Sequence, residues 1–160
     1  MCILCETPID PRDIIEVSLC KKYTGEFPDL SYCEVFICDD CGLSVLPPLP
    51  QCRILDCSHN SLTSLPELPN CRELICNDNR LTTLPNLPKC TSLYCFSNFL
   101  TELPKLNKCV VLYCGDNNLD KLPELPVCVV LKCQKNILTE LPRLPKCLHL
   151  VSHDNIYLPL

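Results

Sequence analysis

The amino-acid sequence predicts a mainly β solenoid with few or no helices, and three observations lead to that fold class. The composition is unusual, because 17 of the 160 residues are Cys, 16 are Pro and only 3 are Gly. Two series of cysteines recur with a constant spacing of 19 residues, and leucines and asparagines keep the same spacing between them. A fixed period of this size indicates a solenoid, in which each unit buries its apolar side against its neighbours.

The two series define what we call the first and second cysteine columns. The first column contains Cys33, Cys52, Cys71, Cys90, Cys109, Cys128 and Cys147. The second column contains Cys38, Cys57, Cys76, Cys95, Cys114 and Cys133, with Ser152 at its seventh place. An asparagine follows the second column at Asn60, Asn79, Asn98, Asn117, Asn136 and Asn155. The unit therefore reads C-x-x-L-x-C-x-x-N-x-L-x-x-L-P-x-L-P-x.

The same period sets the expected domain limits. An earlier, degenerate unit is identified by Ile14, Val17 and Leu19, which fall at the places of the column and central apolar residues. Terminal units of a solenoid are atypical because one of their sides lacks a neighbouring repeat. We therefore expect an N-terminal cap at residues 1–13 and a solenoid at 14–160, made of the degenerate unit 14–32 and seven regular units at 33–160, the last one incomplete.

Each unit contains a strand pattern followed by a segment that cannot be helical. In Leu55-Asp56-Cys57 the leucine and cysteine share one face and the aspartate lies on the other, as in a strand. Successive strands of this kind are expected to stack in parallel, about 4.8 Å apart. The return segment, as in Leu65-Pro66-Glu67-Leu68-Pro69, repeats prolines that lack a backbone donor and restrict the residues before them. Its backbone is expected to be extended or polyproline-like.

The unit resembles the leucine-rich repeat signature L-x-x-L-x-L-x-x-N-x-L, with Cys in place of the first and third leucines. The trailing L-P-x-L-P is similar to the short repeats of bacterial type III effectors, and cysteine-substituted repeats of this kind resemble those of some giant-virus proteins. The resemblance implies a parallel sheet on the concave face and asparagine side chains that point inward to backbone groups of adjacent turns. It also implies recognition of proteins, without the catalytic ubiquitin-ligase domain of the effectors, for which these residues have no room.

The charge and the distribution of apolar residues limit the cellular compartments and the classes of partner that we expect. The first residues, Met1-Cys2-Ile3-Leu4-Cys5-Glu6, have no basic segment and lose their apolar character at Glu6, so we expect no secretory signal. No apolar run approaches the roughly 20 residues of a membrane span. We therefore expect a soluble, cytoplasmic protein with reduced thiols that does not bind membranes. The net charge of −5 argues against nucleic acid as a partner and favours a protein.

The column cysteines are expected to serve as small apolar residues in a narrow core. A disulfide within one unit is out of reach, and one between neighbouring units would be strained. Soft-metal binding along a column is an alternative, and so is zinc binding by two C-x-x-C pairs, Cys2 with Cys5 and Cys38 with Cys41, with Cys20 as a substitute ligand. Cys38 and Cys41 already occupy the column and asparagine places, so we expect no metal or other cofactor.

The sequence shows no enzyme chemistry. It lacks a glycine-rich phosphate loop, a nucleophile elbow and paired carboxylates at a shared place. His149 and His153 lie near Cys147, but the repeat places Cys147 inward and His149 outward, so a solvated pair of histidines is expected instead of a ligand set. We therefore predict that the chain is not an enzyme.

The outward positions of the strands form an apolar and aromatic stripe, which is the expected binding surface. Aromatic side chains on an exposed sheet are enriched at binding hot spots. Aspartates such as Asp78 make the N-terminal part of this side acidic, and Lys135 adds to a basic C-terminal part. The alternative is that strands favour such residues even when exposed. The predicted contact residues, centred on the two tyrosines, are Ile37, Asp56, Ile75, Tyr94, Phe96, Val111, Tyr113 and Lys132.

These expectations combine into one functional hypothesis with two alternatives. The chain is predicted to be a non-enzymatic protein-interaction module, and a viral or host-directed effector if the resemblance extends that far. The first alternative is a cysteine-rich protein that binds zinc or a soft metal. The second is a structural protein that assembles, for example as a homodimer, through an open C-terminal end at Ile156 to Leu160.

Overall fold

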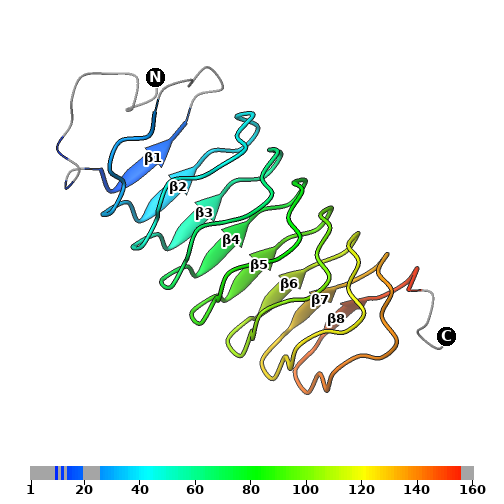
Figure 1. Ribbon diagram of the computed structural model, residues 1–160. Coiled ribbons are helices and arrows are strands. Elements are labelled where there is room, and N and C mark those ends of the chain that lie inside the picture. The colour runs from blue at the N-terminus through cyan, green and yellow to red at the C-terminus, as the bar shows by residue number, and fades with distance from the viewer. Residues whose placement is uncertain (1–9, 11, 13, 20–25, 156–160) are drawn as a thin grey trace.

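A computed structural model describes residues 10, 12, 14–19 and 26–155 of the chain. One parallel sheet of eight strands, in the order of the sequence, runs through this part (Figure 1). The strands are β1 (Glu16–Ser18), β2 (Val35–Ile37), β3 (Ile54–Asp56), β4 (Glu73–Ile75), β5 (Ser92–Tyr94), β6 (Val111–Tyr113), β7 (Val130–Lys132) and β8 (His149–Val151). The described residues contain no α-helix. The predicted mainly β solenoid of 19-residue units is confirmed.

The register explains why equivalent residues form columns. Leu55 of β3 pairs with Leu74 of β4, and Leu74 pairs with Leu93 of β5, so the offset between strands equals the sequence period. The central residue of each strand from β1 to β7 is buried, while its two neighbours face outward. A side chain therefore meets its own counterpart from the next unit, which is why one residue type can be repeated along the core.

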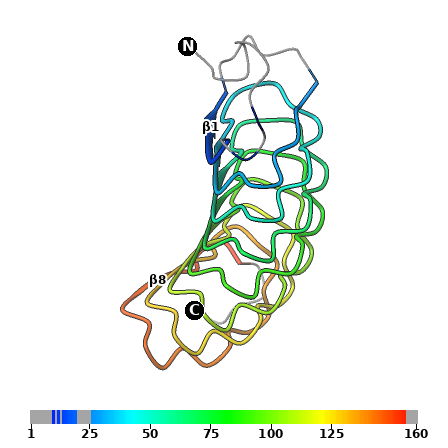
Figure 2. The same cartoon turned by 90° about the vertical axis from the view of Figure 1, so that its left-hand side faces the viewer.

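The sheet lies along the concave side of a curved stack, and the proline-rich return segments form the convex side (Figure 2). Leucines of the return segment, such as Leu68 and Leu87, are buried against the back of the strands. The described residues contain no helix long and apolar enough to cross a membrane. Because the convex side is extended chain instead of helix, each turn of the solenoid is thin.

The two ends of the described stack differ in the burial of their apolar residues. Val17 of β1 is buried and pairs with Phe36 of β2, and Ile14 is buried beside them. Most of the predicted cap at residues 1–13 lies outside the described residues. At the other end, Leu148 is 77% exposed and Leu150 is 46% exposed. The segment Ile156 to Leu160, on which the predicted self-assembly depended, also lies outside the described residues.

Both cysteine columns lie in the core. Every second-column cysteine is fully buried, and every first-column cysteine is buried except Cys147, which is half-buried at the last described unit. All cysteines among the described residues are free thiols. The thiols thus pack in the narrow space between the sheet and the return segments.

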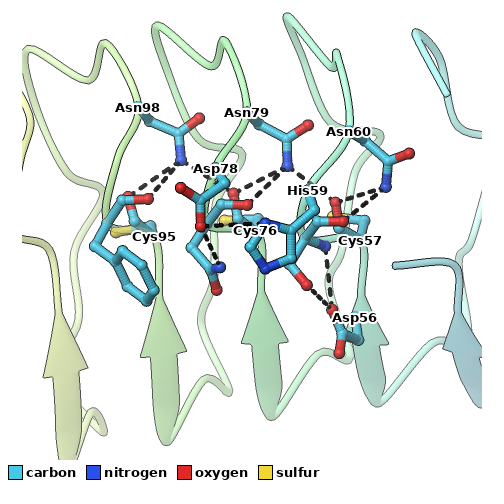
Figure 3. Close-up of polar contacts among 12 residues, drawn as sticks. Asp56, Cys57, His59, Asn60, Cys76, Asp78, Asn79, Cys95 and Asn98 are labelled. Carbon is cyan, nitrogen blue, oxygen red and sulfur yellow. Dashed lines mark hydrogen bonds and ion pairs between the residues drawn. The ribbon is translucent and has the colours of Figure 1, made fainter. Parts of the chain in front are cut away.

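An asparagine ladder joins successive turns behind the second column (Figure 3). The side-chain nitrogen of Asn98 donates to the carbonyl oxygen of Cys95 at 3.2 Å and to that of Cys76, one turn earlier, at 3.0 Å. Its side-chain oxygen accepts from the backbone N–H of Leu81 at 3.0 Å. The inward asparagine that the repeat resemblance implied is present, and it satisfies backbone groups that the turn would leave buried without partners.

The turn between the second column and the asparagine has a left-handed backbone that the sequence analysis did not predict. One residue of each regular unit has a φ between 50° and 57°, namely Asp40, His59, Asp78, Ser97, Asp116, Lys135 and Asp154. Aspartate tolerates this conformation better than most residues, and it stands at four of the seven positions. The recurrence of Asp immediately before the ladder asparagine was the sequence signal for this turn.

Candidate functional site

The outward positions of the sheet form two rows of side chains on the concave face. The row at the C-terminal end of the strands contains six of the predicted contact residues in consecutive order. They are Ile37, Asp56, Ile75, Tyr94, Tyr113 and Lys132, and all are half-buried. Val111 lies in the other row on β6, and Phe96 follows β5 and is also half-buried. The alternation of residues in the sequence therefore placed the seven strand residues at outward positions of the sheet.

Three of these residues are in direct contact. The rings of Tyr94 and Tyr113, on neighbouring strands β5 and β6, have centroids 5.0 Å apart and planes at 76°, an edge-to-face arrangement. The ammonium nitrogen of Lys132, on β7, lies 4.3 Å from the centroid of the Tyr113 ring. Such ring pairs and cation–π contacts each contribute about 0.5–1.5 kcal/mol. They hold the three side chains in one arrangement on three rigid strands.

The surroundings of Tyr94 favour its neutral form. Partial burial raises the pKa of the Tyr94 hydroxyl, with smaller contributions from the nearby Glu73, Tyr113 and Cys109. The phenol is therefore protonated at neutral pH and can donate a hydrogen bond to a bound group. An apolar ring with a donor at its tip is the amphipathic combination found at protein interfaces.

Asp56 differs from its neighbours in the row because it already has partners within the chain. Its carboxylate accepts from the hydroxyl of Ser58 at 2.6 Å and from the Ser58 backbone N–H at 3.1 Å. One unit later, Asp78 lies 3.5 Å from the His59 ring nitrogen and accepts from the amide of Asn77 at 2.9 Å (Figure 3). These acidic groups lie at or just beyond the C-terminal ends of the strands, so we call this margin the acidic edge. It comprises Asp39, Asp40, Asp56, Asp78 and Asp116.

Sequence reasoning missed two features of this face. The side-chain amide of Gln134 lies directly over Gly115, where an added Cβ would come within 2.7 Å of the amide nitrogen. The oxygen of that amide is buried with no hydrogen-bond partner. A glycine at a place that otherwise carries larger residues was the available signal. The second feature is a set of cationic side chains, Arg53, Arg72, Lys89 and Lys108, that precede four successive strands.

Two of the candidate zinc ligands, Cys38 and Cys41, lie among the described residues. Cys38 is fully buried in the second column, and burial raises the pKa of its thiol. Cys41 is half-buried, and its thiol donates to the carbonyl oxygen of Asp39 at 3.3 Å. Cys2, Cys5 and Cys20 lie outside the described residues. The part of the chain that the structure describes has no group of three or more potential ligands.

Thiol ionisation is disfavoured along both columns. Burial raises the pKa of Cys90 to about 11 and that of Cys52 to about 12. It raises the pKa of Cys76 well above its ordinary value. These thiols are therefore neutral near pH 7. Thiolates, which are the nucleophilic and metal-binding form, do not accumulate there.

The histidines also keep apart from the columns. His153 is exposed and its ring nitrogen lies 2.9 Å from the carboxylate of Asp154. His149 is exposed on β8, whereas Cys147 packs against the core and its thiol donates to the carbonyl oxygen of His149 at 3.4 Å. Cys147 and the ring of His149 thus occupy opposite faces, as expected.

No protein-family model matches this chain, and a search of curated proteins found no match. Solved structures do match. The curved parallel sheet with 19-residue turns and an asparagine ladder defines the fold as a leucine-rich repeat solenoid. The chain is similar to YopM, a leucine-rich effector protein from Yersinia pestis, at a TM-score of 0.79 and 28% identity over 91% of this chain. It is also similar to YopM from Yersinia enterocolitica WA-314, at a TM-score of 0.73 and 37% identity over 91% of this chain. The similarity spans 44% and 30% of the lengths of those two chains.

Proposed function

We propose that this protein is a protein-interaction module that recognises its partner through the concave face, with Tyr94 and Tyr113 at the centre of the contact. The observation that carries the proposal is the packed set of Tyr94, Tyr113 and Lys132 on three adjacent strands. Binding hot spots are enriched in tyrosine and lie near the centre of an interface, surrounded by weaker contacts. Ile75, Phe96 and Val111 would supply those surrounding contacts.

The backbone beneath this surface supports the proposal, because it is fixed before any partner arrives. Strands β5, β6 and β7 pair on both sides, and Asn98, Asn117 and Asn136 tie the following turns together. A partner that binds to a rigid surface loses less free energy to ordering than one that binds to a flexible loop. The Tyr94–Tyr113 contact also limits the rotamers of both rings in the free protein.

The similarity to two effector structures favours a host-directed effector as the biological setting. The free thiols favour a reducing compartment such as the cytoplasm, since disulfides form and persist in oxidising ones. The absence of enzyme motifs in the sequence agrees with a role in recognition. The zinc and self-assembly alternatives depend largely on residues outside the described part of the chain. The soft-metal alternative is disfavoured by the burial that keeps the column thiols neutral.

The test is a comparison of matched tyrosine variants. A partner captured from cell extract would be identified, purified and titrated against the protein by calorimetry. Tyr94→Ala with Tyr113→Ala is expected to weaken binding at least about thirtyfold, because hot-spot truncations cost about 2 kcal/mol or more. The control is Tyr32→Ala with Val45→Ala, which removes two exposed side chains outside the strands. Equal affinity of the two variants for the partner, with native circular dichroism in both, would contradict the proposal.

A further inference from the structure

Cationic side chains gather at the margin where the chain enters strands β3 to β6. We call this margin the basic edge, and it comprises Arg53, Arg72, Lys89 and Lys108, one before each of these four strands. All four side chains are exposed. The chain as a whole has a net charge of −5, so this local excess of positive charge opposes the overall balance. The acidic edge lies at the other ends of the strands, so the concave face is flanked by opposite charges.

Side-chain hydrogen bonds order the basic edge from one turn to the next. The ammonium group of Lys89 donates to the side-chain oxygen of Asn70 at 2.7 Å. The amide nitrogen of Asn70 in turn donates to the carbonyl oxygen of Pro50 at 2.9 Å. Because Asn70 is itself fixed to the preceding turn, Lys89 is held at this margin instead of extending freely into solvent.

Only part of this charge is neutralised within the chain. Arg53 forms an ion pair with Glu34, with 3.0 Å between the guanidinium and carboxylate atoms. Among the described residues, the structure gives the side chains of Arg72 and Lys108 no ion pair or hydrogen bond, and Lys89 contacts only a neutral amide. Glu73, the first residue of β4, directly follows Arg72, but its side chain lies on the concave face near Tyr94. Three cations therefore remain available to an external anion.

Two shallow pockets lie along the same margin. One, of about 100 Å³, is lined by Glu34, Gln51, Arg53, Asn70, Arg72 and Lys89. The next, of about 320 Å³, is lined by Asn86, Pro88, Lys105, Asn107 and Lys108. Pro88, which lines the second pocket, directly precedes Lys89, which lines the first. Four turns span three interstrand spacings, about 14 Å, which an extended peptide covers with about five residues.

We propose that the basic edge binds an acidic, extended segment of the partner protein whose apolar part contacts Tyr94 and Tyr113. The proposal rests on the proposed function and adds the chemistry and orientation of the partner. A short acidic segment is favoured over a nucleic acid because the acidic edge across the sheet would repel a longer polyanion. The opposite charges of the two edges would also admit the partner in one orientation, since the reversed one would place its carboxylates against the aspartates.

A titration with hexaglutamate tests the proposal directly. Isotope-labelled protein is titrated with this peptide and followed by amide chemical shifts. The expected shifts are confined to the turns that carry Arg53, Arg72, Lys89 and Lys108, and they decrease with added salt. Shifts scattered over the whole surface, or none, would overturn the proposal.

A matched pair of charge variants separates a site from general attraction. Arg72→Glu with Lys89→Glu is expected to weaken hexaglutamate binding about tenfold, since each exposed charge pair contributes up to about 1 kcal/mol. Lys121→Glu with Arg143→Glu makes the same change in net charge at exposed positions on the convex side. If both variants weaken binding equally, the proposal is wrong. Arg72→Gln with Lys89→Gln provides the same comparison should the charge reversal affect folding.

Two further measurements distinguish this inference from the proposed function and from a nucleic-acid site. Tyr94→Ala with Tyr113→Ala should leave hexaglutamate binding unchanged, because the peptide has no apolar part. If hexaglutamate fails to bind while the purified partner still requires the tyrosines, the basic-edge proposal falls and the proposed function stands. A short single-stranded oligonucleotide that binds this edge more tightly than hexaglutamate would overturn the assignment to an acidic peptide.

Discussion

The two cysteine columns repeat the same residue at the same period, yet their thiols have different surroundings. In the first column, the thiol of Cys52 donates to the carbonyl oxygen of Ile54 at 3.1 Å, and the thiol of Cys90 donates to that of Ser92 at 3.3 Å. In the second column, the described residues offer no thiol hydrogen bond to Cys76 or Cys95. There it is the backbone carbonyls that have partners, namely the asparagine amides.

The difference shows that cysteine meets two requirements in this fold. In the first column, cysteine is a small side chain whose thiol donates a weak hydrogen bond to a carbonyl oxygen of the following strand. In the second column it is a small apolar side chain in a space that is closed by the asparagine ladder. Free cysteine suits both places because it packs like an apolar residue and tolerates an unused thiol hydrogen.

The largest expected effect comes from alkaline pH, which acts on both columns at once. The pKa of Cys90 is raised from 9.0 to about 11, so its contribution to stability is complete below about pH 9 and is lost as the pH rises toward 11. Each such thiol changes the free energy of unfolding by about 1.4 kcal/mol per pH unit in that window. With many buried thiols, the solenoid should unfold cooperatively above about pH 9, as measured by circular dichroism.

The same titration can sharpen the comparison between the columns. The pKa of Cys90 is raised to about 11, whereas the pKa of the second-column Cys76 is raised well above the ordinary value in a fully buried position. Thiolate absorbance should therefore begin at Cys90 and reach Cys76 only at higher pH. If all thiols ionised together near pH 9, the ordinary value of 9.0, while the circular dichroism stayed native, the burial assigned to both columns would be wrong.

Asn98→Ala removes the restraint on the second column without touching a cysteine. The variant leaves the N–H of Leu81 without its side-chain acceptor. The carbonyls of Cys76 and Cys95 each lose one of two asparagine donors and keep the other, Asn79 and Asn117 respectively. Because a buried polar group without a partner costs about 1–3 kcal/mol, the free energy of unfolding should fall by about 1–3 kcal/mol in urea titrations. The control is Asn118→Ala, at an exposed place in the next unit, whose side chain is not part of the ladder; it should change the free energy of unfolding by less than about 0.5 kcal/mol.

Serine substitutions compare the columns directly. In Cys90→Ser the new hydroxyl can donate to the carbonyl oxygen of Ser92, the acceptor that the thiol already uses. In Cys95→Ser the described surroundings provide no such acceptor, so the buried hydroxyl pays its desolvation cost. We expect Cys95→Ser to be the less stable of the two by about 1–2 kcal/mol in urea unfolding. Equal stabilities would mean that the hydrogen bond from the Cys90 thiol to the Ser92 carbonyl does not contribute to the free energy of unfolding.

The smallest expected effect concerns the left-handed turn that follows the second column. Lys135 has a φ of 53°, which costs a non-glycine residue about 1–2 kcal/mol. Lys135→Gly removes that cost but adds about 0.5–1 kcal/mol of unfolded-state entropy, so a net gain of about 0.5 kcal/mol is expected. Lys121→Gly, at an exposed position without a positive φ, should instead destabilise the protein. Thermal midpoints of both variants check the sign; a loss of stability in Lys135→Gly would contradict the assigned turn.

Much of the concave site followed from the alternation of residues in the strands. Tyr94, Tyr113 and Lys132 share one place in the repeat, so a parallel register of 19 residues had to bring them together. The edge-to-face ring contact and the position of the ammonium group over Tyr113 did not follow, because they depend on rotamers chosen among neighbours from three turns. The buried amide of Gln134 over Gly115 was missed for the same reason.

The sequence by itself determined the solenoid, its period, its two cysteine columns and the outward place of the tyrosines, because all of these depend on which residue recurs at which position. Only the tertiary structure decided which thiols donate a hydrogen bond, where the backbone turns left-handed, and how Asn70 orients Lys89. It also revealed that the concave face lies between a basic and an acidic edge. The physical reason is that these hydrogen bonds and charge patterns form between residues of neighbouring turns. Their geometry depends on how the turns stack, which the sequence of one unit does not specify.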